Sequence, residues 1–189
     1  MSNLPVFFNY KNENADSGYE TIQDMFLSWT LRCATKSNEN SEFRNLNKYS
    51  KRVLLDLIFD NEIPENIIVE SVKTKRQWNL IDLLVEVKLE IKGEMKEYVL
   101  NIENKWYTSV RPEQLEKSIK AVNEKYIDNN FNIINLIIMP DYEKYNDNLK
   151  ALAKKMNYKV KIIEEIKENA KMKEKTGNYL FDEYWFRFY

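Results

Sequence analysis

An alternation of apolar and polar residues between positions 81 and 104 is the clearest structural signal in the chain. The odd positions from 81 to 91 are all apolar, and the even positions between them are charged except for Leu84. After Lys92-Gly93, a second apolar set occupies alternate positions at Tyr98, Leu100 and Ile102. A period of two is typical of strands with one buried face, so this segment predicts a β-hairpin.

The turn of this hairpin is expected at Lys92-Gly93, because glycine tolerates the positive φ that tight two-residue turns need. Counting outward from that turn, the two apolar sets face the same side of the sheet, and Asp82 lies opposite Glu103. Directly opposed Cβ atoms are about 5 Å apart. Lys105 is two residues beyond Glu103 and projects from the same face. The pattern therefore brings two carboxylates and an ammonium together.

This combination of side chains suits metal-dependent hydrolysis. Two adjacent carboxylates repel each other unless a cation offsets their charge, and Mg²⁺ accepts one or two carboxylates while keeping several waters. The ammonium of Lys105 would hold or polarise an attacking water, while the metal stabilises charge that develops on a phosphate. Mn²⁺ is an alternative metal. The structural alternative is a surface ion pair across a solvated strand pair, which contributes little to stability.

These residues resemble the core of the PD-(D/E)xK nuclease superfamily. The resemblance rests on Ile81-Asp82, on Glu103-Asn104-Lys105 in the next strand, and on Gln114-Leu115 at the start of a helix. It extends from about residue 17 to about residue 164. Isoleucine replaces the proline of the family motif, as it frequently does in such families. The resemblance implies an α/β fold of the restriction-endonuclease type, with a central mixed sheet flanked by helices.

The resemblance also implies roles for individual residues. Asp82 and Glu103 would hold the metal together with the backbone carbonyl of Asn104. Lys105 would position the water and stabilise the transition state. Gln114 would orient a water or the scissile phosphate, although an exposed helix glutamine would look the same in the sequence.

Many members of the superfamily place a glutamate of the first helix near the metal. In this chain Glu20 is the candidate for that additional metal ligand. Ser17 and Glu20 also fit a capping box, which would explain the glutamate without any metal. Glu70 is a further candidate ligand, for which a solvent-facing position is favoured.

Other segments predict the rest of an α/β domain. Helices are expected over residues 17–34, 42–59, 112–126 and 142–156, and strands over 67–72, 132–139 and 158–163. The order of elements after residue 97 predicts right-handed crossover connections. We interpret residues 1–189 as a single domain with an N-terminal arm at 1–16 and an aromatic tail at 165–189. The tail is expected to dock on its own domain or to form a dimer contact, rather than to stack on bases.

Composition excludes several kinds of chemistry. The 189 residues contain no histidine, which excludes Ser–His and Cys–His catalysis and histidine-bound zinc. One cysteine, Cys33, excludes an intramolecular disulfide. The sequence shows no apolar run long enough to cross a membrane and no signal pattern, so a cytoplasmic protein without a membrane partner is expected.

A net charge of −1 argues for a localised basic surface or for a partner that brings the substrate, because non-specific nucleic-acid binders are usually basic. Lysines cluster between positions 150 and 161, and those from 167 to 175 are interleaved with acids. This mix favours a solvated helical face over a phosphate-binding patch. The function implied is Mg²⁺-dependent hydrolysis of nucleic acid, with DNA favoured over RNA, in phage or host defence or in DNA processing. The alternative is a catalytically silent nuclease-fold protein that binds a protein or a nucleotide. A homodimer stays open.

Overall fold

The computed structural model of the protein describes residues 18–39, 42–60, 62–106, 109–127, 130–140 and 145–188. The expected N-terminal arm lies outside these residues. The strands are β1 (Ile67–Trp78), β2 (Ile81–Ile91), β3 (Glu94–Asn104), β4 (Asn132–Met139) and β5 (Tyr158–Ile162). The α-helices are α1 (Gly18–Arg32), α2 (Arg44–Phe59), α3 (Pro112–Tyr126), α4 (Asp147–Lys155), α5 (Ile163–Asn169) and α6 (Tyr179–Glu183). A short 3-10 helix η1 (Lys36–Asn38) and a π-helix η2 (Tyr184–Phe188) complete the set.

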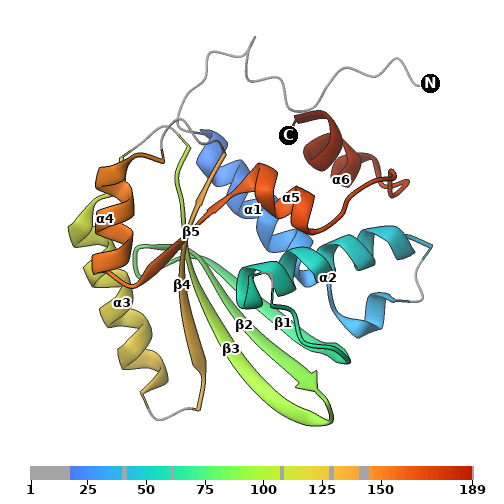
Figure 1. The fold of residues 1–189 in the computed structure, drawn as a ribbon, viewed down its shortest axis with the longest axis horizontal. Helices are drawn as coiled ribbons and strands as arrows, with labels where there is room; N and C mark the ends of the chain where they lie inside the picture. The colour runs from blue at the N-terminus through green and yellow to red at the C-terminus, as the bar shows by residue number, and fades with distance from the viewer. Residues whose placement is uncertain are drawn as a thin grey trace.

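A five-stranded mixed sheet in the order β1-β2-β3-β4-β5 forms the centre of the molecule (Figure 1). Helices α3 and α4 cover one face, and α1, α2 and α5 cover the other. The expected α/β class with a mixed sheet between helices is therefore confirmed. Among the described residues, no helix is both long enough and apolar enough to cross a membrane.

The β2–β3 hairpin has the register that the alternating pattern predicts. Leu83 pairs with Ile102, and the ladder closes at Ile91 and Glu94. Lys92 and Gly93 form the turn with φ values of 52° and 85°. Such a pair of positive φ values defines the type I′ turn, whose twist matches that of the strands.

Strand β1 is longer than the segment 67–72 that the sequence predicts. It pairs antiparallel with β2 as far as Trp78. Residues 73–77 are polar and mostly exposed. Their side chains therefore carry no apolar pattern from which a strand could be predicted.

The other half of the sheet is parallel. Strand β3 pairs with β4, and β4 pairs with β5, as the alternation of strands and helices predicts. One large apolar core lies between the sheet and α1, α2 and α5, and it includes Leu83 and Ile102. A smaller core on the opposite face joins Leu115 of α3 to Ile137 of β4. The end of β3 thus lies between two packed layers.

Several helix boundaries differ from those expected. Helix α1 ends at Arg32, α2 begins at Arg44, and α4 begins at Asp147, where Asn146 accepts a bond from Leu149 N at 3.0 Å. Residues 141–144, in which the fourth helix was expected to begin, are not described. Helix α5 was not predicted, because its seven residues are too few to show a clear helical period.

The aromatic tail packs against its own domain. Tyr184 stacks on Phe26 of α1 with ring centroids 4.3 Å apart. Phe181 contacts Trp29 edge-on at 6.3 Å, and Phe181 and Trp185 are almost completely buried. The tail therefore completes the core on the α1 side of the sheet.

Candidate active site

The site begins where β2 and β3 separate. The last paired residues of their ladder are Leu83 and Ile102, one step short of the expected pair of Asp82 and Glu103. Beyond this point the N–H of Asn104 donates to Asp82 Oδ2 at 2.9 Å. The carboxylate of Asp82 thus accepts the hydrogen bond that a main-chain carbonyl would accept in a continued ladder. It is held against the end of β3.

Glu103 and Lys105 lie together at this end of β3. Lys105 Nζ is 2.5 Å from Glu103 Oε1, and the two residues are only 6% and 2% exposed. Strand β3 remains attached to β4 there, because Lys105 N donates to Ile138 O at 2.9 Å. The segment that carries the ion pair is therefore held by β4 on one side and by Asp82 on the other.

Burial makes both acids of the site costly to ionise. It raises the pKa of Glu103 to about 7, and repulsion from Asp82 adds to this effect, while the Lys105 ammonium opposes it. Burial also raises the pKa of Asp82, against the opposing effects of the Asn104 N–H and of Lys105. A cation bound between the two carboxylates would favour their charged forms.

A second layer of the site, on α1, was missed by sequence reasoning. Asn104 Nδ2 donates a short hydrogen bond to Asp24 Oδ1, and Gln23 Nε2 donates to Asn104 Oδ1 at 3.0 Å. Asp24 is 2% exposed, and burial raises its pKa to about 6. Gln23 Oε1 is buried without a hydrogen-bond partner among the described residues. Asp24 lies one helical turn after Glu20, and that spacing was the only signal available.

Gln77 links Asp24 to Asp82. Its Nε2 donates to Asp24 Oδ2 at 3.1 Å and approaches Asp82 Oδ1 at 3.4 Å. Gln77, Asn79 and Leu80 all have positive φ, at 51°, 48° and 68°. Non-glycine residues rarely adopt this conformation, which costs energy. The turn between β1 and β2 is therefore strained where it holds the amide of Gln77 between two acids.

Glu20 lies beside the site and contacts the main chain. Its Oε1 accepts a hydrogen bond from Trp106 N at 3.0 Å. Its charge contributes to raising the pKa of Asp82 and of Glu103. Ser17, the expected capping partner, is outside the described residues.

The other two candidate residues, Gln114 and Glu70, contribute less to the active site. Gln114 lies half-buried in the first turn of α3, where its N–H donates to Arg111 O at 3.1 Å. Its side chain makes no hydrogen bond with any other described residue. Glu70 forms an ion pair with Lys36 at 2.5 Å and belongs to the middle of β1.

A polar network beneath Glu103 connects β3 to α3 and β5. Asn101 Nδ2 donates to Tyr158 Oη at 3.0 Å and to Ser118 Oγ at 3.3 Å. The two hydroxyls are 2.6 Å apart. Burial raises the pKa of Tyr158 to about 12, and the nearby charge of Glu103 adds to the shift. This network fixes the strand that carries the ion pair.

The donors present fit a hydrated divalent cation. In the described part of the chain, no three carboxylate or thiol groups lie close enough to form a metal site unaided. Asp82 and Glu103 nevertheless offer hard oxygen ligands at one place, and Mg²⁺ usually binds to proteins through one or two carboxylates plus waters. The geometry therefore suits a metal that keeps much of its water.

Comparison with known proteins gives one match. A family model described as the PD-(D/E)XK nuclease superfamily matches residues 6–185. The matched region contains every residue of the site. Neither a search of curated proteins nor a search of solved structures finds a match.

Proposed function

The chain belongs to the PD-(D/E)XK nuclease superfamily, and we propose that it is a divalent-metal-dependent nuclease that hydrolyses phosphodiester bonds. One observation carries this proposal: Asp82, Glu103 and Lys105 come together at the end of β3. Mg²⁺ is the favoured metal, with Mn²⁺ as the alternative. DNA is the favoured substrate over RNA.

Asp82 and Glu103 would hold the metal, helped by the backbone carbonyl of Asn104. When bound, the cation would supply positive charge to the phosphate and lower the pKa of a water molecule. The side chain of Asn104 is bound to Asp24 and Gln23 of α1, so its main chain is held in place beside Asp82. Glu20 would contribute through its charge and through its bond to Trp106 N.

Lys105 would orient the attacking water and stabilise the negative charge that builds up on the phosphate. Its ammonium is fixed by Glu103 and is almost buried, so it needs little rearrangement during the reaction. Gln114, at the start of α3, would orient the water or the phosphate from the other side. These roles require that a phosphate can enter beside the ion pair.

A cleavage panel tests the proposal. Single-stranded and double-stranded DNA and RNA are incubated with the protein in Mg²⁺, in Mn²⁺ and in EDTA. We expect metal-dependent cleavage of at least one substrate and none in EDTA. Lys105→Ala should remove the activity, whereas Lys120→Ala, a change of an exposed lysine on α3, should leave it unchanged.

A second candidate function has support from the burial of the ion pair. Glu103 and Lys105 neutralise each other at 2.5 Å and are nearly closed to solvent. A nuclease-fold protein without activity, which binds another protein or a nucleotide, would have such a site. A folded chain that binds no metal and cleaves no member of the panel would favour this candidate.

A further inference from the structure

The outer face of α2 is strongly basic. Its first nine residues include Arg44, Lys48, Lys51 and Arg52. The only acid of this helix is Asp56, which is 1% exposed and accepts a bond from Lys161 Nζ at 3.1 Å. The exposed surface of α2 therefore has no carboxylate of its own to offset the four cations.

These four cations line one hollow of about 640 Å³, together with Glu39, Asn47 and Leu55. Glu39 is the only acid in that lining, and it pairs loosely with Lys51 at 3.7 Å. Arg44 and Lys48 are exposed and form no ion pair or side-chain hydrogen bond with any other described residue. The hollow thus presents two cations, Arg44 and Lys48, that have no acidic partner among the described residues.

The basic face continues onto the segment that follows α5. Lys173 N and Glu174 N both donate to Tyr49 Oη of α2, at 3.3 and 3.2 Å. Arg52 Nη1 donates to Ala170 O at 3.1 Å. These bonds hold the segment that carries Lys171 and Lys173 against α2.

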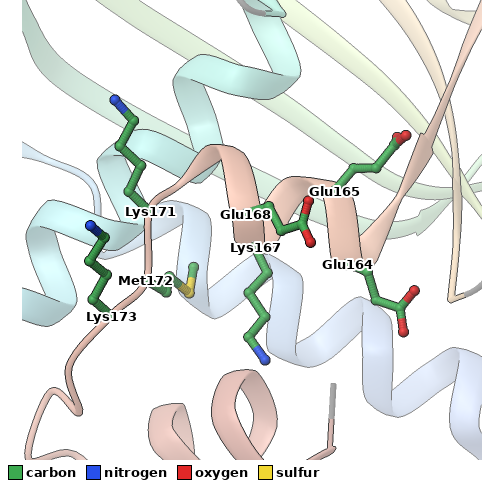
Figure 2. Close-up of a pocket in the computed structure, with 7 residues that line it drawn as sticks. All are labelled: Glu164, Glu165, Lys167, Glu168, Lys171, Met172 and Lys173. Atoms are coloured by element: carbon green, nitrogen blue, oxygen red, sulfur yellow. The ribbon is translucent and has the colours of Figure 1, made fainter.

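Figure 2 shows where the basic face ends. Lys171 and Lys173 extend on one side of a second hollow, of about 540 Å³, and the carboxylates of Glu164 and Glu165 extend on the other. We define the basic surface by the cations on the first side and on α2: Arg44, Lys48, Lys51, Arg52, Lys171 and Lys173.

We propose that the basic surface binds the phosphate backbone of nucleic acid, at a place separate from the active site. The choice of nucleic acid among polyanions rests on the proposed nuclease function. Arg and Lys side chains that neutralise phosphates release bound counterions, and this release supplies most of the affinity of non-specific binding. A chain of net charge −1 needs such a local surface to hold a polyanion.

The two lysines of β5, Lys159 and Lys161, are already paired. Lys161 lies 2.8 Å from Asp60 Oδ1, and Lys159 lies 2.6 Å from Asp60 Oδ2. Both lysines therefore join β5 to the end of α2 and are not free to bind phosphate. Because they are paired, Lys159 and Lys161 do not belong to the basic surface.

The length of α1 indicates how far the active site lies from the basic surface. Its first turns carry Glu20 and Asp24 at the active site, and its C-terminal end adjoins α2, where Asn47 Nδ2 donates to Cys33 O at 2.7 Å. From Glu20 to Arg32, α1 rises about 18 Å at 1.5 Å per residue. About five base pairs of B-form duplex cover this distance at 3.4 Å each. Shorter duplexes cannot reach both places.

Binding in EDTA tests the proposal without any cleavage. Fluorescence anisotropy measures the affinity for labelled single-stranded and double-stranded DNA and RNA of about 30 and of about 5 nucleotides, over a series of salt concentrations. The variant combines Arg44→Glu with Lys48→Glu. The control combines Lys154→Glu with Lys155→Glu, two exposed lysines at the end of α4. Circular dichroism verifies that both variants are folded.

We expect the variant to bind the long strand about tenfold or more weakly and to reduce the slope of log K against log salt by about 2, since two phosphate contacts are lost. The control should show no such change, and the wild type should bind the short strand more weakly than the long one, because fewer phosphates are contacted. Unchanged affinity for the long strand, or an equal loss in the control, would overturn the proposal. Binding of poly-glutamate without any binding of nucleic acid would also overturn it, in favour of an acidic protein partner.

The outcome is distinguishable from failure of the nuclease assignment. If the wild type cleaves no substrate, but the Arg44 and Lys48 variant binds long strands more weakly, the result supports the basic surface and overturns the proposed nuclease function. If the wild type cleaves DNA and the variant binds with unchanged affinity, the result supports the nuclease function and overturns the basic surface.

Discussion

The main-chain N–H of Asn104 donates to the carboxylate of Asp82 at 2.9 Å, where the ladder between β2 and β3 has ended. The side chain of the same asparagine is bound by Asp24 and Gln23 of α1. One residue thus joins a proposed metal ligand to a helix on the far face of the sheet. The position of Asp82 depends on both connections.

Asp82→Ala should destabilise the protein more than Asp82→Asn. Alanine leaves the N–H of Asn104 without its acceptor, which costs about 1–3 kcal/mol, whereas the amide oxygen of asparagine can still accept the bond. Urea unfolding at pH 7 measures the difference. Equal free energies of unfolding for the two variants would mean that the bond to Asn104 contributes nothing.

Lys105→Ala should reduce cleavage by about 100-fold or more, because it removes a charge that would stabilise the transition state. It should also destabilise the fold, since buried Glu103 loses its partner. Adding Glu103→Gln to this variant removes the unpaired charge and should restore stability but not cleavage. A fully active Lys105→Ala protein would refute the role assigned to the lysine.

The metal-free protein should lose stability as the pH rises from 5 to 8. The folded pKa of Glu103 is about 7 and that of Asp24 about 6, both above their ordinary values. The folded state therefore binds more protons than the unfolded state in this range, and the free energy of unfolding falls by a few kcal/mol as these protons are lost. Urea unfolding in EDTA at several pH values measures this fall.

Glu103→Gln provides the control for the pH experiment, because it removes the contribution of Glu103 to the pH dependence of stability and leaves that of Asp24. Its stability should depend less on pH than that of the wild type. Added Mg²⁺ should restore wild-type stability at pH 8, where the carboxylates are charged. A wild-type free energy of unfolding that rises between pH 5 and pH 8 would contradict the raised pKa values.

Asp24→Ala should lower both stability and cleavage although Asp24 is not assigned as a metal ligand. The change leaves Asn104 Nδ2 buried without an acceptor, at a cost of about 1–3 kcal/mol, and frees the segment that holds Asp82. Unfolding and steady-state kinetics measure the two effects. Met25→Ala changes an exposed neighbour on α1 and should leave both quantities unchanged.

Phe181→Ala should cost about 3–5 kcal/mol of stability, as large-to-small changes in a core do. Phe181 is fully buried against Trp29 and Tyr49. Leu180→Ala, at a neighbouring residue that is 45% exposed, should cost far less. Thermal unfolding compares the two. Similar losses would mean that the tail does not pack against the core.

The parts of the fold that could be predicted are those in which one physical pattern dominates. The hairpin register followed from the period of two and from the glycine in the turn, and it placed Glu103 and Lys105 on one face. The second half of β1 could not be predicted, because residues 73–77 are all polar and show no alternation of apolar and polar side chains. Helix α5 is too short to show a period.

The α1 side of the site shows the other limit of sequence reasoning. Asp24 looks like an ordinary polar residue of an amphipathic helix, and only the packing of α1 against the end of β3 shows that it is buried. Gln77 contacts two acids from the end of β1, where it adopts a positive φ although it is not a glycine. Neither contact leaves a pattern in the sequence, since each depends on residues that are far apart along the chain.

Calorimetric titration of Mg²⁺ and Mn²⁺ into wild type and Asp82→Asn tests the central claim most directly, with the cleavage panel run beside it. The asparagine can keep the bond to Asn104 but lacks the charge that would hold a cation. We expect saturable binding and cleavage in the wild type and the loss of both in the variant. Equal binding by the two proteins, or no binding and no cleavage by either, would contradict the assignment of Asp82 and Glu103 to a catalytic metal site.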